Sequence, residues 1–91
     1  MENKFGLHCF ISGKVQGVWY RASAQDEAVA LGLTGFARNL PDGRVEVKAF
    51  GEKEQVLVFY TWLKKGPKFA HVEEASFMEC PWEDFDRFAV K

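Results

Sequence analysis

Two hydrophobic periodicities alternate along the chain, and their order restricts the possible folds more than any other feature of the sequence. Apolar residues at every second position predict a strand over residues 5–11, and an apolar stripe at helical spacing predicts a helix over residues 53–65. The other expected elements are a helix over 21–31, strands over 35–40, 44–50 and 72–80, and a short extended piece over 86–90.

This order, β-α-β-β-α-β, predicts a ferredoxin-like α+β fold, an antiparallel sheet with two helices on one face. Residues 12–17 are expected to form the loop between the first strand and the first helix. The 91 residues fit a single domain, and 47% of them are hydrophobic. A chain of this length buries roughly 60–65% of its unfolded surface. We therefore expect one domain, residues 1–91, that needs neither metal nor disulfide to fold.

Charge and cysteine content restrict the location and the partners. The net charge of −1 disfavours general binding to nucleic acids. No segment has the apolar length of a membrane span, and the N-terminal MENKFGLHCFISG lacks a signal-peptide pattern, so a cytoplasmic location is expected. Cys9 and Cys80 form no C-x-x-C pair and are expected to be reduced thiols, although only their distance can decide whether they form a disulfide.

The stretch KVQGVWYRAS, residues 14–23, contains a glycine between two valines and places Arg21 at the expected start of a helix. Helix N-termini carry a partial positive charge and favour an anion rather than a cation. Gly17 allows the backbone to curl, so that the N–H groups of the loop and of the first helical turn point into one concavity. A phosphate there would accept hydrogen bonds from these N–H groups and from the guanidinium. The stretch therefore predicts an anion site, with a solvated surface arginine as the alternative.

Two segments resemble the signatures of the acylphosphatase family. SGKVQGVWYRAS is similar to the pattern G-x-V-Q-G-V, two residues and arginine, and GFARNLPDGRVEVKAFG is similar to glycine-aromatic-x-x-Asn, two residues, Asp-Gly-x-Val-Glu. The resemblance covers about residues 5–90 and implies a small free-standing member. Tyr20 departs from the phenylalanine of many members. The C-terminal FAVK lacks the aromatic ending common in the family, which puts in doubt a contact between this end and the active site.

The resemblance also implies roles for individual residues. Arg21 would be the catalytic arginine that binds the phosphoryl oxygens, and Asn39 would orient the attacking water. The residues implied in phosphate binding form the loop and its flanks: Lys14, Val15, Gln16, Gly17, Val18, Trp19, Tyr20 and Arg21. Without the resemblance, Asn39 is explained more simply as a turn-forming residue before the Pro-Asp-Gly turn.

The implied reaction is hydrolysis of an acyl phosphate to a carboxylate and inorganic phosphate, without a metal, a cofactor or a covalent phosphoenzyme. The leaving carboxylate has a conjugate acid with a pKa of about 4, so no protein acid needs to protonate it. The sequence accordingly shows no obvious acid–base pair. The expected partners are the small-molecule acyl phosphate and inorganic phosphate, without nucleic acid or membrane, and the chain is expected to be a monomer.

Three other functions stay open at this point. A ferredoxin-like module that binds single-stranded RNA, as RRM domains do, would use Phe10 and Phe50 on the sheet face opposite the helices, although the RNP1 pattern is absent. A degenerate acylphosphatase-like domain would bind phosphate without turnover. Acylphosphatase-like domains also occur at the start of larger hydrogenase-maturation carbamoyltransferases, but the chain is expected to lack room for that transferase machinery.

Overall fold

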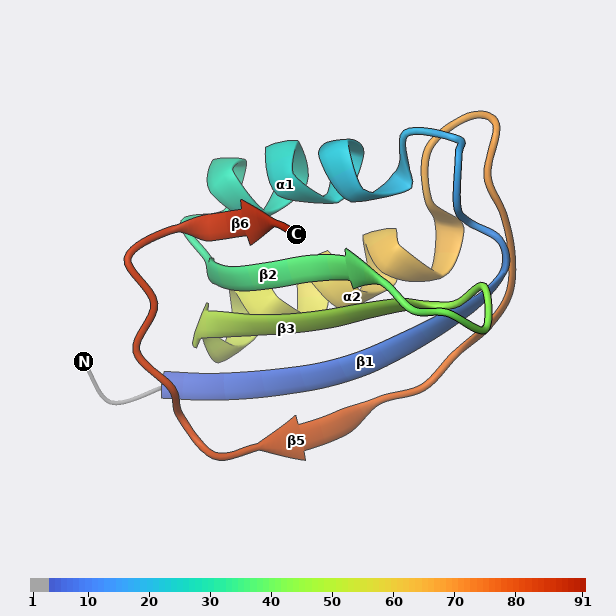
Figure 1. Cartoon of the computed structure of the whole chain (residues 1–91). Coiled ribbons are helices and arrows are strands. Elements are labelled where there is room, and N and C mark those ends of the chain that lie inside the picture. Colours follow the sequence, from blue (N-terminus) through green and yellow to red (C-terminus); the bar gives the residue numbers. More distant parts are fainter. Residues whose placement is uncertain (1–3) are drawn as a thin grey trace.

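The computed structural model describes residues 4–91, so the first three residues of the predicted domain and of the N-terminal segment lie outside the described part (Figure 1). The elements, in chain order, are β1 (Lys4–Lys14), α1 (Tyr20–Ala30), β2 (Thr34–Asn39), β3 (Val45–Glu52), α2 (Lys53–Lys65), β4 (His71–Ala75), β5 (Met78–Cys80) and β6 (Phe88–Val90). Neither helix in the described residues is long and apolar enough to cross a membrane.

The strands form one sheet in the order β4-β1-β3-β2-β6, and β5 also pairs with β1. The pairs of β1 with β3, β4 and β5, and of β2 with β3, are antiparallel. The last strand, β6, runs parallel to β2 at the edge of the sheet. The predicted ferredoxin-like fold is confirmed. The extended piece predicted over residues 86–90 contains β6, whose parallel pairing with β2 makes the sheet mixed at this edge.

The core lies between the sheet and the two helices, which cover the same face (Figure 1). Alternate residues of β1 and β3, among them Leu7, Cys9 and Val47, point to this face and have no exposed surface. On α2, Val56, Phe59 and Leu63 pack against them at the predicted helical spacing. The burial of these apolar side chains is the main term that stabilises the fold.

Two predicted strands differ from the structure by more than two residues or are divided. The first strand does not end before Ser12, because β1 continues to Lys14 and pairs with β4, with a register shift between Ser12 and Gly13. The strand predicted over residues 72–80 is broken into β4 and β5. At the break, the Ser76 N–H donates to the Phe10 oxygen at 3.0 Å, and the Ser76 hydroxyl accepts from the Phe10 N–H at 2.9 Å. Both differences depend on contacts between residues more than fifty positions apart in the sequence. The local periodicity of apolar residues does not predict such contacts.

The sheet face opposite the helices is covered by the segment that leads from β5 to β6. Phe50 is only 1% exposed, because Phe85 stacks on its ring with centroids 5.5 Å apart and Trp82 meets its edge at 5.7 Å. At the other end of this face, the Arg44 guanidinium lies over the Phe10 ring, 4.8 Å from its centroid. The two phenylalanines on which the RNA-binding alternative depended are therefore not a free stacking platform.

A buried carboxylate lies on the same face, beside Phe10. Glu46 is 7% exposed, and its two oxygens accept hydrogen bonds from His8 Nε2 at 2.7 Å and from Arg38 Nε at 2.5 Å. Burial by itself would raise the pKa of Glu46, but the hydrogen bonds from His8 and Arg38 outweigh it and hold this pKa below its usual value. The ionised form of Glu46 therefore stabilises the folded sheet.

This network predicts a pH-dependent loss of stability in Glu46→Gln. Because the folded pKa of Glu46 is depressed, its stabilisation is fully present above the unfolded pKa and is lost as the pH falls through the folded value. We expect Glu46→Gln to lower the free energy of unfolding by roughly 1–3 kcal/mol at neutral pH and by less in acid. Urea unfolding at both pH values measures the difference, with exposed Glu79→Gln as the control. An equal loss at both pH values would contradict this account.

Candidate active site

The loop between β1 and α1 has an unusual backbone. Gly17 has a φ of 75° and Trp19 a φ of 66°, so both lie in the left-handed region. Trp19 is the one residue other than glycine with a positive φ among residues 4–91. A left-handed conformation costs such a residue about 1–2 kcal/mol. Alternation of handedness along a short segment turns successive N–H groups into a concavity that suits an anion.

The donors of this loop are available to a ligand. Within the described part of the chain, the main-chain hydrogen bonds of turns, loops and caps include none from the N–H groups of residues 16–20. No side chain of residues 4–91 caps the N-terminus of α1. The space beside Gly17 is also open, because a Cβ atom added there would contact nothing within 4 Å. The loop therefore has N–H groups without a main-chain partner at the start of a helix, and the space beside its Gly17 is open.

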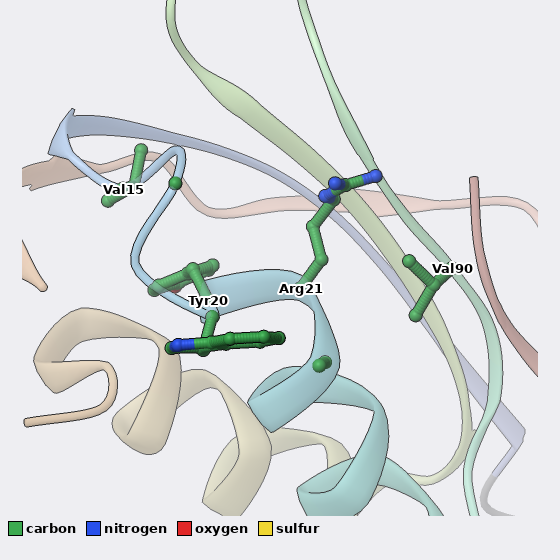
Figure 2. A pocket seen from close by; sticks show the side chains of 7 residues that line it. Val15, Tyr20, Arg21 and Val90 are labelled. Atoms are coloured by element: carbon green, nitrogen blue, oxygen red, sulfur yellow. The ribbon is translucent and has the colours of Figure 1, made fainter.

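A pocket of about 340 Å³ opens at this loop (Figure 2). The residues that line it are Val15, Gly17, Trp19, Tyr20, Arg21, Ala22 and Val90. In Figure 2 the Arg21 side chain extends from the first turn of α1, with Val15 on one side and Val90 on the other. Among the described residues that line the pocket, Arg21 has the one charged side chain, so the lining side chains carry a positive charge.

The end of β6 holds the Arg21 side chain in place. Arg21 Nη1 donates to the main-chain oxygen of Lys91 at 2.5 Å, and the Lys91 N–H donates to the Ala37 oxygen at 2.9 Å. Val90 is the parallel partner of Ala37 in the sheet. The contact between this end of the chain and the site, placed in doubt by the missing aromatic ending, is therefore present and is made by the main chain.

Asn39 lies close to this arrangement along the sheet. It is the last residue of β2, two positions after Ala37, and it pairs with Val45. Because side chains alternate along a strand, Asn39 shares the helix-side face with Ala37 and Val45. Its side chain is exposed, and it is not among the residues that line the pocket. Asn39 therefore stands at the open end of β2, on the same side of the sheet as α1.

The turn after Asn39 does not depend on its amide. The Leu40 N–H donates to the Arg44 oxygen at 2.8 Å, and the Gly43 N–H donates to the Leu40 oxygen at 3.1 Å. The Asp42 carboxylate accepts from the Arg44 N–H and from Arg44 Nε. The turn-forming alternative for Asn39 therefore has little support, since other residues supply these bonds.

The Gln16 side chain bonds to the turn that follows Asn39. Its side-chain Nε2 donates to the main-chain oxygens of Leu40 and Arg44, both at 2.9 Å. These bonds tie the loop to the turn that follows Asn39. The Gln16 side chain therefore positions the loop against the end of β2, and only its main-chain N–H is left to face a ligand.

Three other predicted phosphate-binding residues have buried side chains: Val15, Val18 and Tyr20. The Tyr20 hydroxyl donates to the Leu63 oxygen at 2.7 Å, and burial raises the pKa of Tyr20, so this phenol stays neutral. Lys14 ends β1, is exposed, and does not line the pocket. The three buried side chains anchor the loop, and Lys14 lies outside the pocket. The groups left to contact a ligand are the main-chain N–H groups of the loop, the Arg21 guanidinium and the exposed Trp19 side chain.

The sequence did not reveal two lining residues, Ala22 and Val90. Ala22 follows Arg21 in the first helical turn and could have been found from that position. Val90 had no such signal, because only the pairing of β6 with β2 brings it to the loop. Cys9 and Cys80 are both free and are not among the residues that line the pocket, and burial raises the pKa of Cys9 to about 12.

Comparison with known proteins agrees with this geometry. The family model for acylphosphatase matches residues 7–90. An acylphosphatase of Legionella pneumophila (strain Lens) is 50% identical over 90 residues, which cover 99% of each chain. The structure of an acylphosphatase from Coxiella burnetii has a TM-score of 0.95 and 39% identity over 99% of this chain and 95% of that one. An acylphosphatase from Bacillus subtilis has a TM-score of 0.92 and 33% identity over 96% and 98%.

Proposed function

Because this chain belongs to the acylphosphatase family, we propose that the pocket between β1 and α1 binds the phosphoryl group of an acyl phosphate for hydrolysis. Water attacks the phosphorus, and the bond between phosphorus and the bridging oxygen breaks. The carboxylate leaves with the electron pair of that bond, and both protons of the water end on the inorganic phosphate. The observation that carries this proposal is the Arg21 guanidinium beside a loop of unpartnered N–H groups.

Electrostatics supports the assignment of the phosphoryl group to this position. Arg21 lies in the first turn of α1, at the helix end that is already partly positive, so this position concentrates positive charge. An anion with several acceptor oxygens offsets this charge and accepts from the N–H groups and the guanidinium together. Donors that are fixed before the reaction stabilise the charge on the transferred group without reorganisation. The Lys91 oxygen, which already orients Arg21, supplies part of this fixation.

In this proposal Asn39 orients the attacking water. Its amide oxygen would accept a hydrogen bond from the water at the open end of β2, and Gln16 keeps the loop against the turn that follows Asn39. A neutral amide is sufficient because phosphoryl transfer requires mainly positioning and charge stabilisation. The leaving carboxylate needs no proton, and the pocket lining within the described residues contains no carboxylate or histidine.

We propose a single domain over residues 1–91 that works as a monomer in the cytoplasm on small molecules, without nucleic acid, membrane, metal or cofactor. The net charge of −1 and the two free thiols support the partner and location proposals, because free thiols persist in a reducing compartment. Light scattering on the purified chain tests the monomer directly.

Hydrolysis of benzoyl phosphate by the wild-type chain in EDTA tests the proposed function. We expect rapid loss of substrate, release of inorganic phosphate, and competitive inhibition by added phosphate. The thermal unfolding transition shows that the assayed protein is folded. If the folded chain leaves benzoyl phosphate and acetyl phosphate intact, the hydrolase proposal fails, and phosphate binding would then identify a degenerate phosphate-binding domain.

A further inference from the structure

We infer that Trp19 selects substrates with a flat aromatic acyl group, an inference that rests on the proposed function of the pocket. Trp19 lines the same pocket as Arg21, yet its side chain is 77% exposed. Among residues 4–91, the only other exposed apolar side chain of appreciable size in the lining is Val90, at 40%. The pocket therefore has a phosphoryl-binding side formed by the loop and Arg21, and an exposed apolar side.

The backbone of the loop does not require a tryptophan at this position. Trp19 is left-handed, with φ 66° and ψ 19°, and glycine adopts this conformation without strain, as Gly17 does two residues earlier. The N-cap position that Trp19 occupies receives no side-chain hydrogen bond. The conformation of the loop therefore does not explain why an exposed tryptophan occupies this strained position. Contact between its side chain and a ligand would explain it.

The core does not use this indole either. Trp62 stacks on Phe59 with centroids 6.2 Å apart, and Trp82 meets the edge of Phe50. Among the aromatic and cation–ring pairs of residues 4–91, none involves Trp19. Its ring faces are thus left for a group that arrives from solvent, and a flat aromatic ring is the group that packs best against them.

The position of the acyl group follows from the phosphoryl site. Once the N–H groups and Arg21 hold the phosphoryl group, the acyl carbon is fixed only one bridging oxygen away from phosphorus. Acetyl phosphate places a single methyl group beyond that carbon, whereas benzoyl phosphate places a whole ring there. Trp19 and Arg21 line the same pocket, so a ring on the acyl carbon is placed to meet the indole, whereas the methyl group contacts it little.

The test compares kcat/KM for benzoyl phosphate and acetyl phosphate in wild type, Trp19→Gly and Trp19→Phe. We expect the benzoyl-to-acetyl ratio to fall about fivefold to tenfold in Trp19→Gly, as is typical of a lost aromatic contact. Trp19→Phe keeps an aromatic face and should hold the ratio within about twofold of wild type. Glycine suits the left-handed backbone, and thermal unfolding verifies that this variant is folded.

Binding without turnover gives a second readout. Phenacylphosphonate and acetonylphosphonate are stable analogues in which a methylene replaces the bridging oxygen, and the ratio of their inhibition constants should change in Trp19→Gly as the substrate ratio does. Phe69→Ala is the control, because Phe69 is 67% exposed but does not line the pocket. An unchanged ratio in Trp19→Gly, or an equal loss for both acyl groups, overturns the inference. A wild type that hydrolyses neither substrate overturns the proposed function instead.

Discussion

Arg21→Gln is expected to lower kcat/KM for benzoyl phosphate by at least about 10³-fold, because arginines that stabilise a transferring phosphoryl group contribute 10³–10⁵ to the rate. Glutamine removes both the charge and the planar fork that binds two phosphoryl oxygens at once. The same variant should also lose competitive inhibition by inorganic phosphate, since phosphate binds to the same groups. Initial rates with and without added phosphate measure both effects.

Two further variants make the Arg21 result specific. Arg21→Lys keeps the positive charge without the fork, and we expect it to recover part of the phosphate affinity but little of the turnover. Arg87→Gln is the matched control, because Arg87 is exposed, lies outside the pocket, and uses only its main-chain oxygen to accept from Gly35. If Arg21→Gln and Arg87→Gln retain the same activity, Arg21 is a solvated surface arginine.

Asn39→Ala is expected to lower kcat for benzoyl phosphate by about 10²–10³-fold, the range observed when one positioned donor or acceptor is removed from an active site. Inhibition by phosphate should change less than about threefold, because the loop and Arg21 are intact. This division separates water orientation from phosphoryl binding. The inhibition constant of phosphate and single-turnover rates at saturating substrate measure the two properties independently.

The fold of Asn39→Ala should be nearly unaffected, because the turn after Asn39 is held by hydrogen bonds of Leu40, Gly43 and Asp42. Gln55→Ala, which removes an amide from α2 outside the pocket, is the matched control. If Asn39→Ala shows a large drop in thermal stability and also loses inhibition by phosphate, the role of Asn39 is to stabilise the turn. Unchanged kcat would exclude it as the residue that orients water.

Local sequence patterns predicted most of the fold correctly. The second helix begins and ends at the predicted residues, Lys53 and Lys65, because an apolar stripe marks its buried face and Gly66 its end. The first helix begins one residue before the predicted start. The extent of β1 and the break between β4 and β5 were not predictable. Ser12–Lys14 are strand only because β4 pairs with them, and the break follows from hydrogen bonds between Phe10 and Ser76.

The sequence by itself determined the order of the elements, the family, and the contiguous loop that carries Arg21, because these features depend on neighbouring residues. Only the tertiary structure decided what positions that loop. Gln16 bonds to oxygens 24 and 28 residues away, and Arg21 to an oxygen 70 residues away. All three acceptors are main-chain oxygens, so no residue type in the sequence could mark them. The exposure of Trp19 and the position of Val90 likewise follow from how the loop, α1 and β6 meet.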